Sequence, residues 1–383
     1  MTEIFLIIFF ISVLLFFLGS GIWVAISMIG VSTIGMMLFT SRPVGDAMAT
    51  TIWGTSSSWT LTALPLFVWM GEILFRTRLS ENLFAGLSPW MQKLPGGLIH
   101  VNVVGCALFA AISGSSAATV ATVGKMSIPE LRKRKYPEKI LLGSLAGSGT
   151  LGLLIPPSII LIIYGVTVQE SIAKLFIAGI IPGIMIALIF MSYVIIWSLI
   201  NKKSMPRYVE NFSFLEKIRK SKQLLPVIIL ISAVIGSIYT GVATATEAAS
   251  LGVVGALILS YFQKSLTIET FKQSLLGATK TSCMIAFILA GSTFLSLAMG
   301  FTGLPRNLAI WIQNMELSPY VLIFVLMIFY IILGMFLDGI SAVVLTMAII
   351  EPMIRQAGFD MIWFGIFLVI VVEMAQITPP VGF

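Results

Sequence analysis

The sequence predicts an all-α polytopic membrane protein with two inverted-topology repeats, each holding a re-entrant helical hairpin and a broken transmembrane helix. Composition, the lengths of the apolar runs and two matched proline breaks lead to this fold class. Of the 383 residues, 58% are hydrophobic and only 10% are charged. Because soluble domains carry about 25% charged residues, lipid is the expected solvent of this chain.

The apolar runs have the length of membrane-spanning helices. Most are near-continuous and reach about twenty residues, whereas strands of a β-barrel would alternate in segments of about ten. The N-terminal run is too long for a signal peptide and has Glu3 where a basic region belongs, so we interpret it as an uncleaved span. We expect scaffold spans within 1–78 and 223–300, and a further span at 172–200.

Two pairs of shorter apolar runs predict re-entrant hairpins at 98–131 and 319–354. Each run of the first pair has about fifteen residues, fewer than a crossing needs. The runs of each pair meet at a small polar tip, which begins at Ser113 in the first hairpin and at Asp338 in the second.

Each hairpin is followed by an apolar segment with two adjacent prolines, which remove backbone donors and interrupt a helix. We predict broken helices at 140–166 and from 361 onward. Pro129 precedes Pro156 by 27 residues, and Pro352 precedes Pro379 by 27 residues. This shared spacing indicates a duplication.

The predicted division is a first repeat at 1–200, a basic linker or arm helix at 201–222 and a second repeat at 223–383. Six basic residues lie within 125–139 and seven within 202–222. Short basic loops mark the cytoplasmic side, and the loop after the second hairpin is nearly neutral, so the halves are expected to be inverted. The stretches 202–222 and 264–274 resemble interfacial surface helices, although a solvated linker also fits 202–222.

The net charge of +7 belongs to these two loops, so it does not indicate nucleic-acid binding. By analogy with the first repeat, the rest of the last crossing and one more span should follow Phe383. We therefore expect a longer natural chain, the alternative being an inactive variant.

The four broken elements predict two cation sites, because unwound carbonyls and helix C-termini suit small hard cations. The alternative is that the glycines and serines only permit close helix packing. The first site would contain Ser113, Gly114, Ser115, Ser116, Gly147, Gly149, Thr150 and Pro156. The second would contain Asp338, Gly339, Ser341, Gln376, Ile377, Thr378 and Pro379.

Helix N-termini at the two tips carry partial positive charge and free N–H groups, which suit an anionic substrate. The residues expected to face that substrate are Ser115, Ser116, Asp338 and Ser341. Asp338 is also an ionisable residue at predicted membrane depth, which indicates function. Arg306 is the nearest basic candidate, with a surface anchor as its alternative role.

The other polar residues of the apolar segments have simpler interpretations. Glu72 is expected to pair with Arg76 four residues later, while function and structural pairing remain equal alternatives for Glu247 and Glu373. His100, the single histidine, fits an interfacial role. The two cysteines, Cys106 and Cys283, predict neither a disulfide nor a metal site.

In these motifs the sequence resembles the large membrane subunit of the tripartite ATP-independent periplasmic (TRAP) transporters. The resemblance covers nearly the whole chain, with the motifs in the family's order. The matching stretches are LPLFVWMGEILFRTRLS, LPGGLIHVNVVGCALFAAISGSSAATVATVGKMSIPELRKRKY, GTLGLLIPPSIILIIYG, SIAKLFIAGIIPG, TATEAA, GMFLDGISAVVLT and ITPPVGF. One departure is Ala245 in TATEAA, where the family pattern has proline.

The resemblance implies an elevator-type secondary importer in the bacterial inner membrane, with sodium ions as coupling ions and no other cofactor. It implies uptake of an organic acid, such as a dicarboxylate, delivered by a periplasmic binding protein. It also implies a small four-helix membrane subunit as partner. Proton coupling through Asp338 and a channel-like permease remain alternatives. A membrane-embedded enzyme would need a cluster of catalytic groups, and one histidine with two separated cysteines does not provide it.

Overall fold

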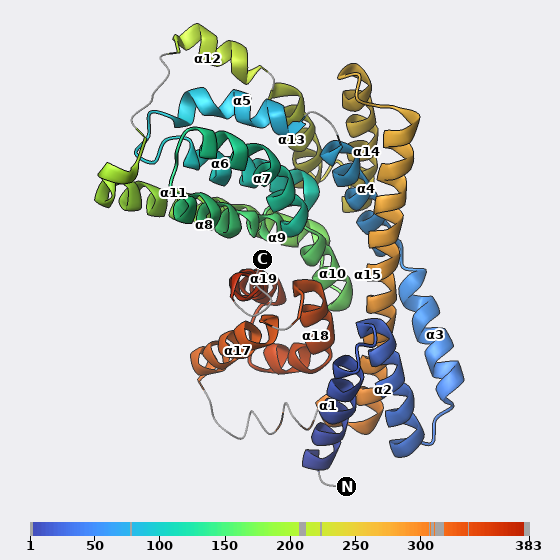
Figure 1. The fold of residues 1–383 in the computed structure, drawn as a ribbon. Coiled ribbons are helices and arrows are strands. Elements are labelled where there is room, and N and C mark those ends of the chain that lie inside the picture. Colours follow the sequence, from blue (N-terminus) through green and yellow to red (C-terminus); the bar gives the residue numbers. More distant parts are fainter. Residues whose placement is uncertain are drawn as a thin grey trace. The chain divides into compact units, whose positions relative to one another are not determined.

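A computed structural model describes residues 3–76, 79–206, 212–222, 224–305, 307, 310, 318–335 and 337–378 (Figure 1). All the regular elements of these residues are helices. Five of the helices are long and apolar enough to cross a membrane, or up to seven if each bent pair forms one span. The chain divides into two compact units, which we call the first-hairpin unit and the second-hairpin unit.

The first-hairpin unit comprises Ala63–Leu161 and Ile172–Lys280. Its helices begin with α4 (Ala63–Phe75), α5 (Leu79–Met91), α6 (Ile99–Ser113), α7 (Ser116–Lys133), α8 (Glu138–Gly149), α9 (Leu151–Leu154) and the start of α10 (Ile159–Thr167). They continue with α11 (Ile172–Ile200), η2 (Lys202–Ser204), α12 (Phe214–Ser221), α13 (Leu225–Tyr239), α14 (Ala245–Phe262) and the start of α15 (Ile268–Thr302).

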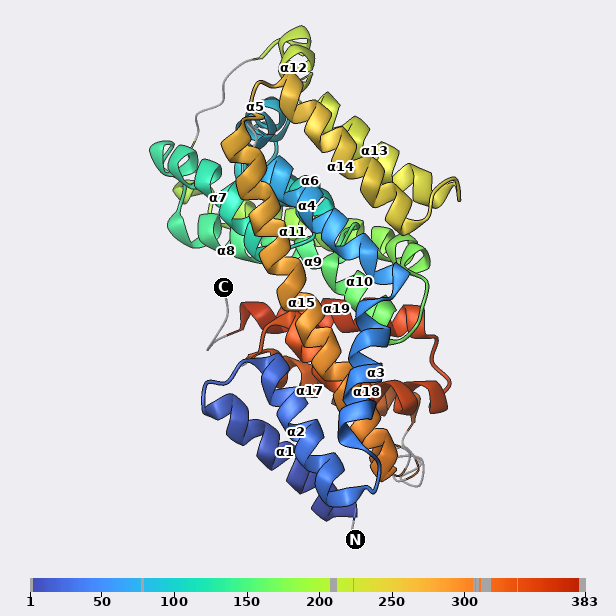
Figure 2. The same ribbon diagram turned by 90° about the vertical axis from the view of Figure 1, so that its right-hand side faces the viewer.

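Within this unit the α6–α7 hairpin is surrounded by helices. The helices α8, α9 and α11 pack against α6, and α4 contacts α6 from another side. Helix α14 packs along α4 and runs beside α13 (Figure 2). The core side chains Ile99, Val103 and Phe109 of α6 are fully buried, so the hairpin is an interior element of the unit.

The second-hairpin unit comprises Met1–Thr62, Ile162–Ser171 and Thr281–Gly382. It contains α1 (Glu3–Gly19), α2 (Val24–Phe39), α3 (Val44–Ser56), η1 (Trp59–Thr62), α17 (Pro319–Gly334), α18 (Gly339–Gln356), α19 (Met361–Ile377) and the remaining parts of α10 and α15. Helix α19 packs on both α17 and α18. The buried Tyr164 hydroxyl, on α10, donates a 2.6 Å hydrogen bond to the Met361 carbonyl at the start of α19.

The structure differs from the predicted scaffold in three places. Helix α3, at Val44–Ser56, escapes the apolar pattern because threonines and Asp46 lie along it. Helix α5 is likewise not predicted. Residues 264–274 do not form a separate surface helix, because α15 runs continuously from Ile268 to Thr302.

The helix order agrees with the two predicted hairpins and the segments after them. The first hairpin, 98–131, corresponds to α6 and α7, and the second, 319–354, to α17 and α18. Each compact unit takes segments from both halves of the chain, so the units are not the repeats. The division into repeats at 201–222 stays a prediction.

Candidate functional site

The tip of the first hairpin is a sharp turn at Gly114. This residue ends α6 in a left-handed conformation, with φ of 59°, which glycine adopts without strain. Its amide donates to the Ala110 carbonyl at 3.1 Å, and its own carbonyl accepts the Ile159 amide at 3.3 Å. The tip is therefore tied to the first residue of α10, immediately after the proline break.

A cluster of hydroxyls lies behind this turn. The Ser113 and Thr119 hydroxyls are hydrogen-bonded to each other at 2.8 Å, and Thr119 Oγ1 donates to the Ser115 carbonyl at 2.8 Å. Ser116 begins α7, is buried, and its Oγ has no hydrogen-bond partner among the described residues. The tip thus holds one buried hydroxyl that is free to bind a ligand.

The first broken helix passes directly beside this tip. It consists of α8, the short α9 and α10, with an extended residue, Ile155, before Pro156 and Pro157. The two prolines have no N–H, so the carbonyls of Gly152 and Leu153 lose their helical donors. The Ser158 hydroxyl donates to the Leu153 carbonyl instead. The helical donor of the Gly152 carbonyl is not replaced in this way.

Gly152 is a point of close approach between the break and the tip. A Cβ atom at this position would lie 2.7 Å from the Ser115 oxygen and 2.9 Å from the Ser116 nitrogen. The main chains of the two elements are therefore in direct contact. This contact places the Gly152 carbonyl segment and the N-terminus of α7 in one small region.

The other predicted residues of the first break have different neighbours. A Cβ at Gly147 would meet Phe190 of α11, and one at Gly149 would meet Val120 of α7. The Thr150 hydroxyl donates to the Gly147 carbonyl at 2.8 Å. Gly147 therefore serves helix packing, as the alternative interpretation held, and Gly149 contacts the hairpin one turn beyond its tip.

The second tip is built differently, around a helix cap. Asp338 precedes α18 and its Oδ2 accepts the Ser341 amide at 3.1 Å. The residue is exposed on its unit rather than enclosed by protein. Capping satisfies an orphan amide at a helix N-terminus, which explains an acidic residue here without any burial. Ser341 is buried, and its Oγ has no hydrogen-bond partner in the described part of the chain.

The end of α19 packs on this second tip. A Cβ at Gly339 would lie 2.5 Å from Gln376 Nε2, and one at Gly334 would lie 2.4 Å from the Ala375 Cβ. Within the described residues, Gln376 Oε1 is buried without a hydrogen-bond partner. Gly339 and Gln376 are therefore in contact, and Ser341 lies two residues after Gly339 on α18.

The remaining predicted residues of the second break are less enclosed. Thr378 is extended, and its hydroxyl donates to the Ala375 carbonyl at 2.5 Å. Ile377 is exposed. Pro379, like Arg306, lies outside the described residues.

Three residues near the first tip were not predicted. Gly152 and Thr119 are described above, and the third is Gly71 of α4, where a Cβ would lie 3.1 Å from the Ile112 oxygen and 3.2 Å from the Ser113 Cα. Gly152 lies inside the glycine-rich break, and this local composition could have indicated a close approach of the main chain. The sequence around Gly71 gives no such indication, because a single glycine in an apolar run does not show which residues pack against it.

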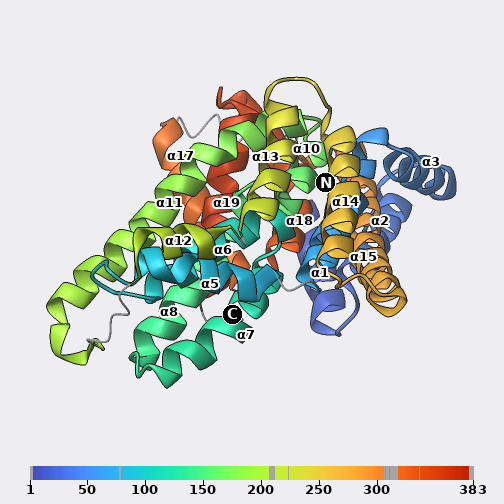
Figure 3. The same ribbon diagram turned by 90° about the horizontal axis from the view of Figure 1, so that it is seen from above.

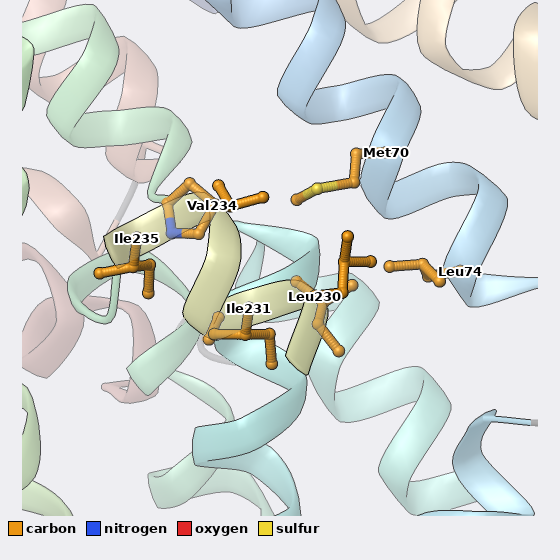
Figure 4. Close-up of a pocket in the computed structure, with 9 residues that line it drawn as sticks. Met70, Leu74, Leu230, Ile231, Val234 and Ile235 are labelled. Atoms are coloured by element: carbon orange, nitrogen blue, oxygen red, sulfur yellow. The ribbon is translucent and has the colours of Figure 1, made fainter. Parts of the chain in front are cut away.

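A narrow crevice lies between α4, α13 and the first hairpin. Figure 4 shows Met70 and Leu74 of α4 opposite the side chains of α13. Ala111, Ile112 and Pro157 complete the lining, which is entirely apolar. The crevice therefore offers no partner to a carboxylate or a cation, and the polar candidates remain those of the tips.

Two of the other ionisable candidates, Glu72 and Glu247, have structural partners. Arg76 Nη2 lies 3.1 Å from Glu72 Oε2, which confirms the predicted pair. Glu247 forms a capping box with Thr244 at the start of α14, so structural pairing describes it. Glu373 is buried within α19.

His100 lies in the first turn of α6, and the two cysteines are far apart in sequence. His100 is buried, with Nε2 at 2.8 Å from the Pro95 carbonyl oxygen. Cys106 is buried and Cys283 is exposed, and both are free thiols.

Comparison with known proteins identifies the family of the chain. Residues 10–383 match the family model described as "Tripartite ATP-independent periplasmic transporter, DctM component". A C4-dicarboxylate TRAP transporter large permease protein of Pseudomonas aeruginosa is 33% identical over 91% of this chain and 81% of that protein.

Two further relatives carry other substrates in their names. A sialic acid TRAP transporter large permease protein of Vibrio cholerae is 30% identical and covers 95% of this chain and 85% of its own length. An isethionate TRAP transporter permease protein, DctMQ, of Oleidesulfovibrio alaskensis is 30% identical over 96% of this chain and 57% of that protein. The chain thus belongs to the DctM component family of the tripartite ATP-independent periplasmic transporters, which are integral proteins of the bacterial inner membrane.

Proposed function

We propose that this chain forms the membrane pathway of a sodium-coupled importer of an organic acid. The names of its relatives support the substrate class, since C4-dicarboxylate, sialic acid and isethionate are all organic acids. The specific acid differs among these relatives, so the proposal is limited to a small carboxylate or a similar organic anion.

One observation carries the proposal: the first hairpin tip packs against an interrupted helix, and the second tip packs against the C-terminal end of α19, once in each compact unit. In the first pair Gly152 contacts the main chain of Ser115, and in the second Gly339 contacts Gln376. Unwound carbonyls and helix C-terminal ends at such breaks coordinate Na⁺ in secondary transporters. Ser116 Oγ and Ser341 Oγ, buried without partners among the described residues, add oxygen donors beside the two breaks.

The tips also suit an anionic substrate, provided that a cation offsets the negative charge of Asp338. The N-termini of α7 and α18 favour negative charge. Asp338 at the start of α18 repels it. A bound cation near the second tip would cancel this repulsion, so substrate affinity would depend on the ion. We therefore assign Ser115 and Ser116 of the first tip, and Asp338 and Ser341 of the second tip, to substrate-facing positions, with Asp338 linking the two ligands.

The proposal includes movement and partners. The hairpins and broken helices would move as a block against the scaffold spans in an elevator cycle. A periplasmic binding protein would deliver the acid, and a small membrane subunit would extend the scaffold. The isethionate relative supports such a subunit, because its name joins the letters M and Q and this chain covers 57% of it.

The test is uptake of a radiolabelled C4-dicarboxylate by proteoliposomes that contain the full-length protein with its partner subunit and binding protein. We expect accumulation only with an inward sodium gradient, at equal pH on both sides. Uptake driven by a pH gradient without sodium would favour proton coupling. Flux without accumulation against a gradient would favour a channel-like permease. Uptake indifferent to sodium would refute the proposal.

The substitution Asp338→Asn tests the proposed role of the carboxylate. Asn and Asp are about equally good helix caps, so the variant removes the charge while keeping the first turn of α18. We expect substrate uptake to lose its dependence on sodium concentration while the thermal midpoint stays near that of the wild type. Unaltered sodium dependence would show that the charge of Asp338 has no part in coupling.

A further inference from the structure

The short helix α12 and the neighbouring helix α5 form a surface that the transport proposal does not use. We call it the α5–α12 platform and define it by Trp90 of α5 and the exposed residues of α12, which spans Phe214–Ser221. Helix α12 lies along α5 (Figure 3). The platform belongs entirely to the first-hairpin unit.

Helix α12 is held in place by specific contacts. The Ser221 hydroxyl accepts the Trp90 indole N–H at 2.7 Å and donates to the Gly86 carbonyl at 3.3 Å. The Trp90 and Phe214 rings meet edge to face with centroids 6.2 Å apart. At the other end, Ser213 and Glu216 form a capping box. A helix of eight residues would be marginal alone, so these contacts indicate that its position has a purpose.

The outer face of α12 is apolar and unprotected. Phe214, Leu215 and Ile218 are 69%, 77% and 38% exposed, and Trp90 beside them is 40% exposed. They lie at i, i+1 and i+4, which places them on one side of a helix. Exposed apolar clusters of this kind mark contact with a partner or a membrane.

Basic side chains flank this apolar face. Residues 212–222 contain Lys217, Arg219, Lys220 and Lys222 against one acidic residue, Glu216, which is occupied in the capping box. Two of the four cations rest on aromatic rings, Lys217 over Trp90 at 5.2 Å and Lys220 over Phe212 at 3.9 Å. Arg219 and Lys222 are exposed. The platform therefore presents fixed positive charge around an apolar face.

The position of α12 in the chain, immediately before an apolar helix, indicates that the platform faces the membrane surface. Helix α12 precedes the apolar α13 and is bent from it by 57°, so α12 leaves the direction of the span it introduces. A basic helix with an apolar face at the end of a span lies at the interface of headgroups and acyl chains. Anionic headgroups attract such cations when the residues are near the membrane surface.

We propose that the α5–α12 platform is a binding site for anionic phospholipids. Phe214, Leu215 and Ile218 insert at the level of the upper acyl chains. Arg219 and Lys222, together with the ring-supported Lys217 and Lys220, bind the headgroup phosphates. The site selects anionic over zwitterionic lipid and is independent of the cation and substrate sites.

The fluorescence of Trp90 provides the test in the reconstituted full chain. The fluorescence of Trp90 is obtained as the difference between the fluorescence of each protein and that of the same protein carrying Trp90→Phe. The bilayers consist of phosphatidylcholine with a fixed fraction of one brominated lipid. This lipid is either phosphatidylglycerol or phosphatidylcholine, and in both cases the bromine atoms are near the top of the acyl chains. We expect stronger quenching of Trp90 by the brominated phosphatidylglycerol. The double variant Arg219→Gln/Lys222→Gln should reduce this preference at least about fivefold, the effect of one surface cation.

The matched control is Lys202→Gln/Lys203→Gln, which removes the same charge from exposed residues of the neighbouring η2. It should keep the preference. Leu215→Ser keeps every charge and should weaken quenching by both lipids, because the apolar face no longer inserts. An equal loss in the two double variants, no preference in the wild type, or unchanged quenching in Leu215→Ser would each overturn the proposal. The last result would favour a protein partner on the platform.

Discussion

Replacement of Gly152 by alanine is the sharpest test of the contact between the first break and the first tip. The added Cβ would lie 2.7, 2.8 and 2.9 Å from the oxygen and carbon of Ser115 and the nitrogen of Ser116. Ordinary contact begins at 3.4 Å, so the tip and the break must separate by 3.4 − 2.7 = 0.7 Å. All three atoms belong to the main chain, so no side-chain rotation can relieve the overlap.

This separation should weaken sodium binding without unfolding the protein. Overpacking of this kind costs about 1–3 kcal/mol. If that free energy opposes the sodium-bound state, the sodium concentration for half-maximal uptake rises about 5- to 150-fold. The assay is sodium-dependent uptake in proteoliposomes, with the thermal midpoint measured in detergent for the same preparation.

Gly143→Ala is the matched control, since a Cβ at that position of α8 has no neighbour within 4 Å. It should leave sodium dependence unchanged and stabilise the helix by up to about 1 kcal/mol. If Gly152→Ala folds and its sodium dependence equals that of Gly143→Ala, the contact does not shape an ion site and the reasoning fails.

Three further predictions concern single contacts. Gly339→Ala should raise the sodium requirement for uptake only a few-fold, because the two close neighbours of its Cβ, Gln376 Nε2 at 2.5 Å and Val372 Cγ1 at 2.7 Å, are side-chain atoms, whereas those of Gly152 are main-chain atoms. Tyr164→Phe should lower stability by about 1–3 kcal/mol, measured by thermal unfolding, because the buried Met361 carbonyl loses its 2.6 Å partner. Ala245→Pro should raise stability by about 0.4–1 kcal/mol in the same assay. Ala245 occupies the first position of α14, where proline is favoured, and the residue before it has the extended backbone that proline requires.

Each of these predictions has a control and a result that contradicts it. Gly300→Ala introduces a Cβ without neighbours and should behave as the wild type, so an equal effect would remove the claim for Gly339. Tyr193→Phe changes a hydroxyl on a residue that is 58% exposed and should be neutral. If it destabilises as much as Tyr164→Phe, the buried hydrogen bond is not the cause. A lower thermal midpoint for Ala245→Pro would show that the helix start is strained by proline.

The sequence predicts those features that depend on length and local chemistry. The hairpins follow from short apolar runs around polar tips, and the interruption of the first broken helix follows from prolines that lack an N–H. Helix α3 is missed because its threonines bond to their own helix, as Thr51 does to Ala47 at 2.7 Å, and so polar residues persist in a helix beside apolar ones. The continuity of α15 is missed because a change in polarity near 274 resembles a boundary, although the backbone has no proline there.

The candidate site is predictable in its elements but not in its contacts. The residue types at the tips and breaks follow from the chemistry of carbonyls and hydroxyls. The choice of Gly152 rather than Gly147 as the contact with the tip depends on the direction in which the helix faces its neighbours. That direction is set by packing against α7 and α11, which lie elsewhere in the chain. The capping role of Asp338 was accessible in principle, since Asp followed by a helix is a common start signal.

The contact at Gly152 is made by peptide groups, and this has a consequence for how such carriers diversify. A contact between main-chain atoms does not change when the hydroxyl and carboxylate side chains of the tips are replaced. Under the proposed function, a lineage can therefore change the acid it carries by substitution at the tips and keep its ion requirement. Only the absence of a side chain at one position of the break has to be preserved.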